Sequence, residues 1–157
     1  MTIYIASDHA GFGLKGKLVS FVRKLGHEVI DLGPVILDPN DDYPLYMKKI
    51  AKEVSADKGS LGIAVAGSGE GEAMVLNRTQ GIRAAVYYGE TGKKQTDAKG
   101  ALLSLLASTR AHNDANVLSI GARFMADDEV ERAIQEWIET PFSGDERHVR
   151  RIAQIDA

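Results

Sequence analysis

The chain contains no cysteine among its 157 residues. Disulfide bonds, thiolate metal ligands and a cysteine nucleophile are therefore all excluded. The sequence also has no apolar run near the roughly 20 residues that span a bilayer. Its opening residues, TIYIASDHAG, lack the basic segment and long apolar run of a secretory signal. These absences predict a cytoplasmic protein that does not enter a membrane.

The net charge is small, and histidines are few. The formal net charge is only −3, so the chain carries no basic excess for nucleic acid or for an anionic membrane surface. Its four histidines lack the tight ligand spacing of a metal site, and we expect no metal. The rest is ordinary for a globular protein, with 44% apolar and 26% charged residues. We expect a single domain over residues 1–157.

Short apolar runs alternate with amphipathic stretches along the whole chain. The run LGIAVAG is apolar at nearly every position, as in a parallel strand that is buried on both faces. Such alternation predicts βαβ units with right-handed crossovers and a mostly parallel sheet. Apolar periodicity predicts strands at 2–6, 28–33, 61–67, 81–88 and 116–123. The same periodicity, with terminating glycines, predicts helices at 14–26, 42–57, 96–110, 126–140 and 145–155. A further helix is expected to begin near residue 71.

Polar and charged residues gather in the segments that follow the expected strands. These segments are SDHAG, LGP, GSGEGE, YYGE and GAR, in chain order. Ligands of open parallel sheets bind beyond the carboxyl ends of the strands. The sequence therefore predicts a ligand site on one rim of the sheet.

The segment AGSGEGEAM combines three alternating glycines with two glutamates. It does not fit a dinucleotide-binding loop, because Glu72 replaces the third glycine and its carboxylate would oppose a pyrophosphate. The segment GFGLKGKL is no P-loop either, because Leu18 replaces the Mg²⁺-binding Ser or Thr. The amides of AGSGEGEAM instead suit an oxygen that becomes charged during a reaction, with Glu72 as a base beside it. The residues alone also allow Glu70 and Glu72 to be first-turn acids that complement a helix dipole.

Cationic side chains that suit a phosphate lie elsewhere in the chain. Arg147 and Arg151 are four residues apart in ERHVRR and would share one helical face, a geometry that also fits a solvated basic surface. Arg123 follows a strand, where an arginine that is buried or at an interface needs an anionic partner.

Two segments with histidine offer acid–base groups. His112 and Asn113 stand in RAHNDAN just before the last expected strand, where His112 fits an acid or base and the segment also fits turn chemistry. Asp8 and His9 follow the first strand, at a position favoured for ligands, where a helix N-cap is the alternative.

Taken together, these motifs resemble the sugar-phosphate isomerase family of type B ribose-5-phosphate isomerases and galactose-6-phosphate isomerase subunits. The resemblance covers nearly the whole chain and rests on SDHAGFGLK, DYP, GSGEGE, GIRAA, HNDANVLSIGAR and RHVRR, in this order. It implies a Rossmann-like, three-layer α/β/α fold with a five-stranded, mainly parallel sheet. It also implies isomerisation of aldose and ketose phosphates through a cis-enediolate, without metal or cofactor, in a homodimer or homotetramer.

The resemblance also implies roles for the matching residues. Glu72 would be the base that moves a proton between C2 and C1, whereas the family's other version has a cysteine where Ala66 stands. His112 would assist ring opening, with Asp8 nearby. The enediolate oxygens would be held by Ser68 and the amides of Gly69, Glu70 and Gly71, and Gly67 would also bind the substrate. The phosphate would be held by His9, Arg123, Arg147 and Arg151, some of them from the partner subunit, and the pocket would be lined by Tyr43 and Asn113. His9 is open to either of two roles, phosphate binding or ring opening.

We therefore expect isomerisation of a phosphorylated sugar, with ribose 5-phosphate and ribulose 5-phosphate as the expected pair. The alternatives are a tetrose or hexose phosphate (erythrulose, allose or galactose phosphate), a non-catalytic module that binds a sugar phosphate or nucleotide, and a structural subunit of a heteromeric isomerase. The segment Gly89–Ala111 is about a dozen residues longer than the family pattern. We expect it beside the pocket rim, as a lid, an interface or a specificity element.

Overall fold

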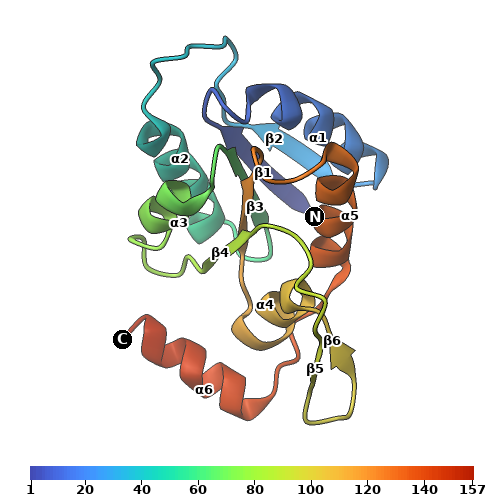
Figure 1. Cartoon of the computed structure of the whole chain (residues 1–157). Coiled ribbons are helices and arrows are strands. Elements are labelled where there is room, and N and C mark those ends of the chain that lie inside the picture. The colour runs from blue at the N-terminus through green and yellow to red at the C-terminus, as the bar shows by residue number, and fades with distance from the viewer.

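The computed structural model describes all 157 residues, and five strands form its central sheet (Figure 1). The strands are β1 (Thr2–Ser7), β2 (Glu28–Asp31), β3 (Leu61–Ala66), β4 (Ala84–Tyr87) and β7 (Val117–Gly121). Their order across the sheet is β2-β1-β3-β7-β4, and every neighbouring pair runs parallel. The five-stranded parallel sheet predicted from the sequence is thus confirmed.

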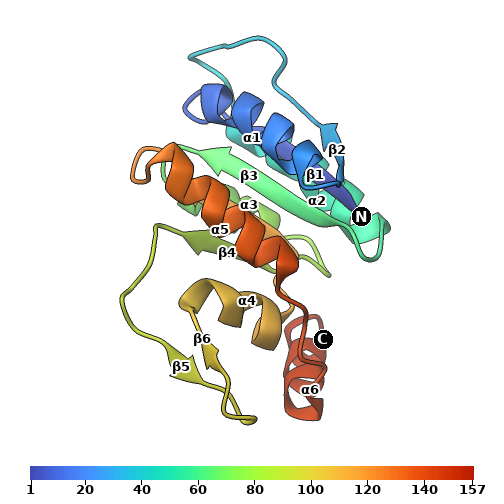
Figure 2. The ribbon, with the colours of Figure 1, turned by 90° about the vertical axis from the view of Figure 1, so that its right-hand side faces the viewer.

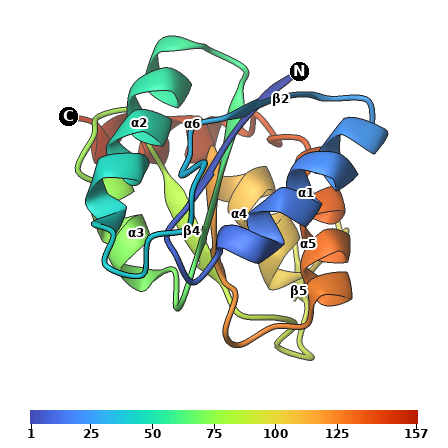
Figure 3. The ribbon, with the colours of Figure 1, turned by 90° about the horizontal axis from the view of Figure 1, so that it is seen from above.

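Six helices accompany the sheet. They are α1 (Phe12–Lys24), α2 (Tyr43–Ala56), α3 (Glu70–Leu76), α4 (Leu105–Asn113), α5 (Asp127–Glu139) and α6 (Glu146–Ile155). On one face, α1 and α5 bury Leu18, Ile134 and Trp137; on the other, α2 and α3 bury Ile50 and Leu76 (Figure 3). Burial of these two apolar layers is the main stabilising contribution, and the expected three-layer architecture is confirmed. None of the helices combines the length and apolar character needed to span a bilayer.

The carboxyl ends of the central strands meet at one edge of the sheet. The register pairs Ser7 with Val65 and Ala66 with Gly121, so that β1, β3 and β7 end side by side. Gly11 shows how closely the next segment packs there, because a Cβ at this position would lie 2.1 Å from the Val65 carbonyl oxygen. Only glycine lets α1 begin so near the end of β3, which explains the glycine of SDHAG.

The prediction of one helix over 96–110 is wrong in its first half. Two short antiparallel strands stand there, β5 (Gln95–Thr96) and β6 (Leu102–Leu103). Asp97 organises the turn between them, because its Oδ1 accepts hydrogen bonds from two backbone N–H groups of the turn. Gly100 completes the turn with a φ of +85°. This side chain-to-backbone bonding outcompetes the helix that the apolar spacing suggested.

The second half of that segment is α4, which runs further than expected. Ser104 Oγ caps its start by accepting the Ala107 N–H at 2.9 Å, and Asp114 ends it with a φ of 45°. His112 and Asn113 therefore belong to the last turn of α4 and not to a separate loop. That turn and α6 lie on the side of the molecule where β3 and β4 begin, away from their arrowheads (Figure 2).

Candidate active site

The glycine loop between β3 and α3 presents backbone N–H groups at the carboxyl edge of the sheet. Gly69 has a φ of +78°, and a Cβ there would lie 2.9 Å from Ser119 Oγ, so the turn requires glycine. Ser119 Oγ donates to the Gly69 carbonyl at 2.7 Å, which fixes the loop on β7. The Glu70 N–H donates to Ser68 Oγ at 3.3 Å, whereas the N–H groups of Gly69 and Gly71 have no backbone acceptor. These two amides are available to an oxygen of a ligand.

Glu72 is buried in the first turn of α3, with only 4% of the residue exposed. Burial raises the pKa of its carboxyl group above the ordinary value of 4.5. A backbone hydrogen bond lowers this pKa in part, while the negative charges of Asp8 and Asp41 raise it further. A carboxylate with a raised pKa is a stronger base, and such shifted groups cluster at functional sites. This environment favours a base over a simple first-turn acid at Glu72.

Glu70, in the same turn, has a different environment. Its side chain is exposed, and its Oε1 accepts a hydrogen bond from the Tyr88 hydroxyl at 2.9 Å. An exposed acid in a first helical turn complements the helix dipole. Of the two interpretations that the sequence left open, each glutamate fits a different one.

Asp8, His9 and Asp41 bring further ionisable groups to this edge. Asp8 Oδ1 accepts the Gly11 N–H at 2.9 Å in the turn before α1. Gly11 is itself the N-cap of α1 and no side chain caps the helix, so Asp8 does not take the N-cap role considered for it. His9 Nδ1 donates to Asp41 Oδ1 at 2.7 Å. Since the charges of Asp8 and Asp41 both act on the pKa of Glu72, these acids lie close to the base.

Tyr43 and Arg123 border the glycine loop on two sides. The Tyr43 hydroxyl lies 2.7 Å from the position that a Cβ of Gly71 would take, and Arg123 Nη1 lies 3.3 Å from the equivalent position of Gly67. Arg123 is exposed, and it forms no salt bridge; the arginines that do are Arg83, Arg110 and Arg132. Its guanidinium is therefore available to an anion. We call the group at this edge the carboxyl-edge cluster: Asp8, His9, Asp41, Tyr43, Ser68, Glu72 and Arg123.

The remaining predicted residues form a second group on α4 and α6. The His112 ring stacks on the His148 ring, with centroids 4.4 Å apart and planes 9° apart. Arg147 Nε donates to His148 Nε2 at 3.2 Å. Arg151 lines a cavity of about 280 Å³ together with both histidines. We call this group the α4–α6 cluster: His112, Asn113, Arg147, His148 and Arg151.

The α4–α6 cluster carries unneutralised positive charge. Neither Arg147 nor Arg151 forms a salt bridge with a carboxylate. Burial lowers the pKa of the His148 imidazole, and the charges of His112 and Arg147 lower it further. A neutral His148 accepts the Arg147 hydrogen bond and gives His112 a flat uncharged surface to stack on. The cluster thus suits an anionic ligand.

Within one chain, the two clusters lie at opposite edges of the sheet. Glu72 follows the end of β3, whereas His112 precedes β7, whose first residue Val117 pairs with Gly62 near the start of β3. Four further residues of β3, at about 3.3 Å per residue, separate these two levels. Figure 2 shows the same division, with α6 on the side where the strands begin. The structure therefore brings Asp8, His9 and Glu72 together but keeps His112 away from them.

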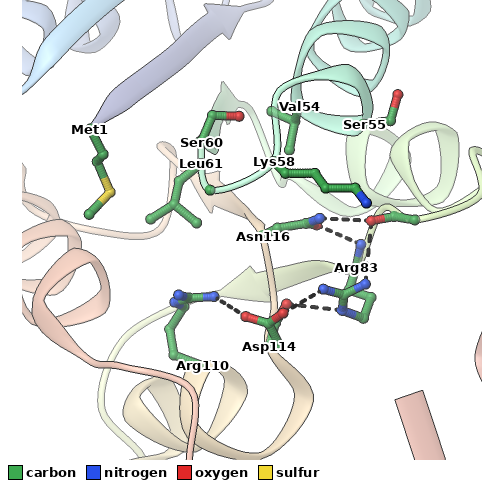
Figure 4. Close-up of a pocket in the computed structure, with 12 residues that line it drawn as sticks. Met1, Val54, Ser55, Lys58, Ser60, Leu61, Arg83, Arg110, Asp114 and Asn116 are labelled. Carbon is green, nitrogen blue, oxygen red and sulfur yellow. Dashed lines mark hydrogen bonds and ion pairs between the residues drawn. The ribbon is translucent and has the colours of Figure 1, made fainter. Parts of the chain in front are cut away.

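A larger cavity of about 430 Å³ also opens at the amino edge of the sheet (Figure 4). Its arginines are already paired: Arg83 and Arg110 each donate to the Asp114 carboxylate at 2.9 Å. Arg83 Nε also donates to the carbonyls of Asn113 and Asp114. These bonds fasten the end of α4 to the start of β4, which is a structural role. By contrast, Arg123, Arg147 and Arg151 of the two clusters form no salt bridge with a carboxylate.

Three residues in or beside the clusters were given no role of their own in the sequence analysis. Asp41 is one of several similar acids before α2, and no local pattern links it to His9. His148 stands inside ERHVRR, and its position one residue after Arg147 was the available signal. Gln95 Nε2 lies 3.5 Å from His112 Nδ1, but Gln95 begins β5 and stands just before the segment that was predicted as helix. No set of three or more His, Asp or Glu side chains is arranged to hold a metal ion.

Comparisons with known proteins point to one family. The family described as Ribose/Galactose Isomerase matches residues 3–155 of the chain. The probable ribose-5-phosphate isomerase B of Mycoplasma pneumoniae is 39% identical over 155 residues, which cover 99% of this chain and 93% of that protein. The ribose-5-phosphate isomerase B of Mycobacterium tuberculosis is 35% identical over 152 residues, which cover 97% of this chain and 86% of that protein.

Solved structures are similar over the same length. The ribose-5-phosphate isomerase B of Mycoplasma genitalium with bound ribulose-5-phosphate matches with a TM-score of 0.85 and 34% identity, over 98% of this chain and 93% of that one. The ribose-5-phosphate isomerase B of Clostridium thermocellum matches with a TM-score of 0.86 and 33% identity, over 99% and 95%. The similarity thus includes every element that carries the two clusters.

Proposed function

The chain belongs to the ribose/galactose isomerase family, and we propose that it interconverts ribose 5-phosphate and ribulose 5-phosphate through a cis-enediolate. The observation that carries this proposal is Glu72, a buried carboxyl group with a raised pKa beside two amides that have no backbone acceptor. The relative from Mycoplasma genitalium holds ribulose-5-phosphate, which supports this ligand. A cytoplasmic location stays a prediction.

In the proposed reaction, the Glu72 carboxylate removes the C2 proton of the open-chain aldose. The electron pair of that C–H bond forms the C1–C2 double bond, and negative charge develops on O1. The amides of Gly69 and Gly71, with the Ser68 hydroxyl, stabilise this oxygen. A proton moves from O2 to O1, and Glu72 returns its proton to C1, which leaves the carbonyl at C2. A single carboxyl group thus accepts and donates the same proton.

We assign the phosphate to arginines contributed by two subunits. Arg123 is the unpaired guanidinium of the carboxyl-edge cluster, and Arg147 and Arg151 are those of the α4–α6 cluster. Because the α4–α6 cluster lies at the far edge of its own chain, we infer a homodimer in which each subunit offers this cluster to the other's Glu72. Two complete sites then form, each with parts of both chains.

Ring opening would also use this shared arrangement. His112 of one subunit would protonate the ring oxygen as the bond from C1 to that oxygen breaks. Asp8 of the other subunit would accept the proton of the C1 hydroxyl. Stacking on His148 holds the His112 ring in place for this transfer. Tyr43 and Asn113 would then line the pocket that encloses the sugar.

Proton exchange in D₂O tests the proposed function. The purified protein is mixed with ribose 5-phosphate, and NMR follows deuterium incorporation at the carbon next to the carbonyl together with formation of ribulose 5-phosphate. We expect both signals with the wild-type protein. Glu72→Gln should lower kcat by about 10²- to 10⁴-fold, because an amide cannot take the proton, while sugar phosphate binding is largely retained.

Glu28→Gln is the matched control, since Glu28 is exposed at the start of β2, and it should behave as wild type. Tetrose and hexose phosphates are assayed alongside the pentose phosphates. Absence of exchange and turnover with all of these sugars would refute the proposal. Faster turnover of a tetrose or hexose phosphate would retain the reaction class and replace the substrate.

A further inference from the structure

We propose that Asp41 is a positioning residue for His9, which fixes the ring nitrogen that His9 presents to the substrate. This inference rests on the proposed function, because it assigns a new residue to the same site. The motif residues do not include Asp41, and only the folded chain brings it to His9, from 32 positions away in the sequence.

The geometry of the pair determines the state of the ring. Asp41 Oδ1 lies 2.7 Å from His9 Nδ1. A carboxylate can only accept a hydrogen bond, so Nδ1 must carry the proton. The Asp41 side chain is 3% exposed, whereas the His9 side chain is 35% exposed. The ring is therefore held from the protein side, and Nε2 is the nitrogen left for a ligand.

Both roles that the sequence left open for His9 require this arrangement. A neutral ring with its proton on Nδ1 accepts a hydrogen bond at Nε2, as from a sugar hydroxyl during ring opening. A protonated ring donates from Nε2, as to a phosphate oxygen. In either case Asp41 keeps the second nitrogen occupied, so that Nε2 acts alone and with a fixed direction.

The segment that carries Asp41 is fastened at both ends. At its start, the Pro34 carbonyl accepts a hydrogen bond from the buried Lys15 ammonium at 2.8 Å. At its end, the Tyr43 hydroxyl packs against Gly71 of the glycine loop. Asp41 itself stands two residues before α2, and its N–H donates to the Asp38 carbonyl at 3.2 Å, so its backbone is held in a turn. A fixed acceptor orients a ring more firmly than a mobile one.

The second carboxylate oxygen argues against a purely structural role. Asp41 Oδ2 is buried without a hydrogen-bond partner. A buried, partly unsatisfied carboxylate costs stability, so a residue retained for stability alone would not be expected here. The Asp41 charge also contributes, after burial and Asp8, to the raised pKa of Glu72. The carboxylate therefore acts on two groups of the proposed site at once.

The test compares Asp41→Asn with Asp38→Asn. Asp38 lies in the same segment, is exposed, and loses the same charge. In Asp41→Asn, the amide can donate to His9 Nδ1, so we expect the proton to move to Nε2, visible in the ¹⁵N–¹H NMR correlations of the ring. His9→Gln identifies the His9 signals by their loss. We expect kcat/KM for ribose 5-phosphate to fall by up to about 100-fold, as for a misplaced catalytic group, and Asp38→Asn to change neither readout.

A double-mutant cycle adds a readout that a structural role would not give. In the His9→Gln background, Asp41→Asn should lower kcat/KM far less than it does in the wild type, because only its weaker effect on the pKa of Glu72 remains. Additive losses, an unmoved ring proton, or an unchanged kcat/KM in Asp41→Asn would each overturn the proposal. The ring spectra need no substrate, so they test the role of Asp41 independently of activity. A wild-type protein that isomerises no sugar phosphate would refute the proposed function and leave the spectral test of Asp41 in place.

Discussion

The carboxyl group of Glu72 is buried, and burial is the main cause of its raised pKa, ahead of the charges of Asp8 and Asp41. In its proposed role as proton acceptor, Glu72 works only when ionised. We therefore predict that kcat/KM falls on the acid side of the pH profile, with a midpoint above the ordinary 4.5 of a glutamate. A pH series of kcat/KM measures this midpoint, and a value at or below 4.5 would contradict it.

The same shift predicts a conflict between catalysis and stability at Glu72. A folded-state pKa above the unfolded value means that the folded chain binds more protons, so stability falls as pH rises from 4.5 through the raised pKa. Glu72→Gln removes the buried charge. Its melting temperature should exceed that of the wild type at neutral pH, and the difference should vanish below pH 4.5. Thermal unfolding at several pH values checks the sign, with Glu28→Gln as the control that shows no gain.

The sequence could single out Glu72 as a candidate site residue and could not single out Asp41, for a physical reason. Glu72 is fixed by its own loop, because the glycines and the glutamate of GSGEGE are neighbours in the chain. Asp41 gains its role only from a contact with His9, 32 residues away. In the sequence it is indistinguishable from Asp38 and Asp42, which are exposed. Local chemistry can thus be read from the chain, whereas a long-range pair needs the fold.

Among the elements, the helix and strand predictions succeed where apolar periodicity is long. They fail over 96–104, the first part of the helix predicted at 96–110, where two leucines at helical spacing from the α4 residues belong instead to β6. The turn bonded to Asp97 separates them, and such side chain-to-backbone bonds compete with helix formation. This hairpin places Gln95 beside His112, the residue proposed for ring opening. The lid, interface and specificity interpretations of Gly89–Ala111 stay predictions.

The contact between α1 and the segment before α2 gives a prediction at this scale. Lys15 is 3% exposed, and its Nζ donates to both Asp31 oxygens at 2.7 Å and to the Pro34 carbonyl at 2.8 Å. Lys15→Met leaves these acceptors without their donor. We expect the free energy of unfolding to fall by about 2 kcal/mol, the usual penalty for a buried group left unsatisfied.

Lys17→Met is the matched control for that experiment. Lys17 is two residues away on α1, and its ion pair with Asp127 is exposed on both sides. An exposed pair contributes less than about 1 kcal/mol. Urea unfolding of both variants gives the comparison. Equal losses in the two variants would show that the Lys15 contact does not hold the segment.

At the scale of the whole molecule, the sequence motifs do not predict that the candidate site residues fall into two separate clusters. The residues of both clusters are visible in the sequence, as GSGEGE and SDHAG for one and HNDAN with RHVRR for the other. Their separation depends on α4 ending at the start of β7 and on α6 packing beside α4, which follows from tertiary structure. A symmetric dimer is the simplest assembly that brings two such distant clusters together twice.

Mixing two inactive variants tests this shared site directly. In the proposed homodimer, Glu72→Gln removes the base from both sites, and Arg151→Ala removes a phosphate ligand from both. In a mixed dimer, one site carries both defects, while the other takes Glu72 from one chain and Arg151 from the other and is intact. Random reassembly of equal amounts makes half of the dimers mixed, so we expect about a quarter of the wild-type kcat/KM. If each chain built its own complete site, every site would keep one defect, and mixing would restore nothing.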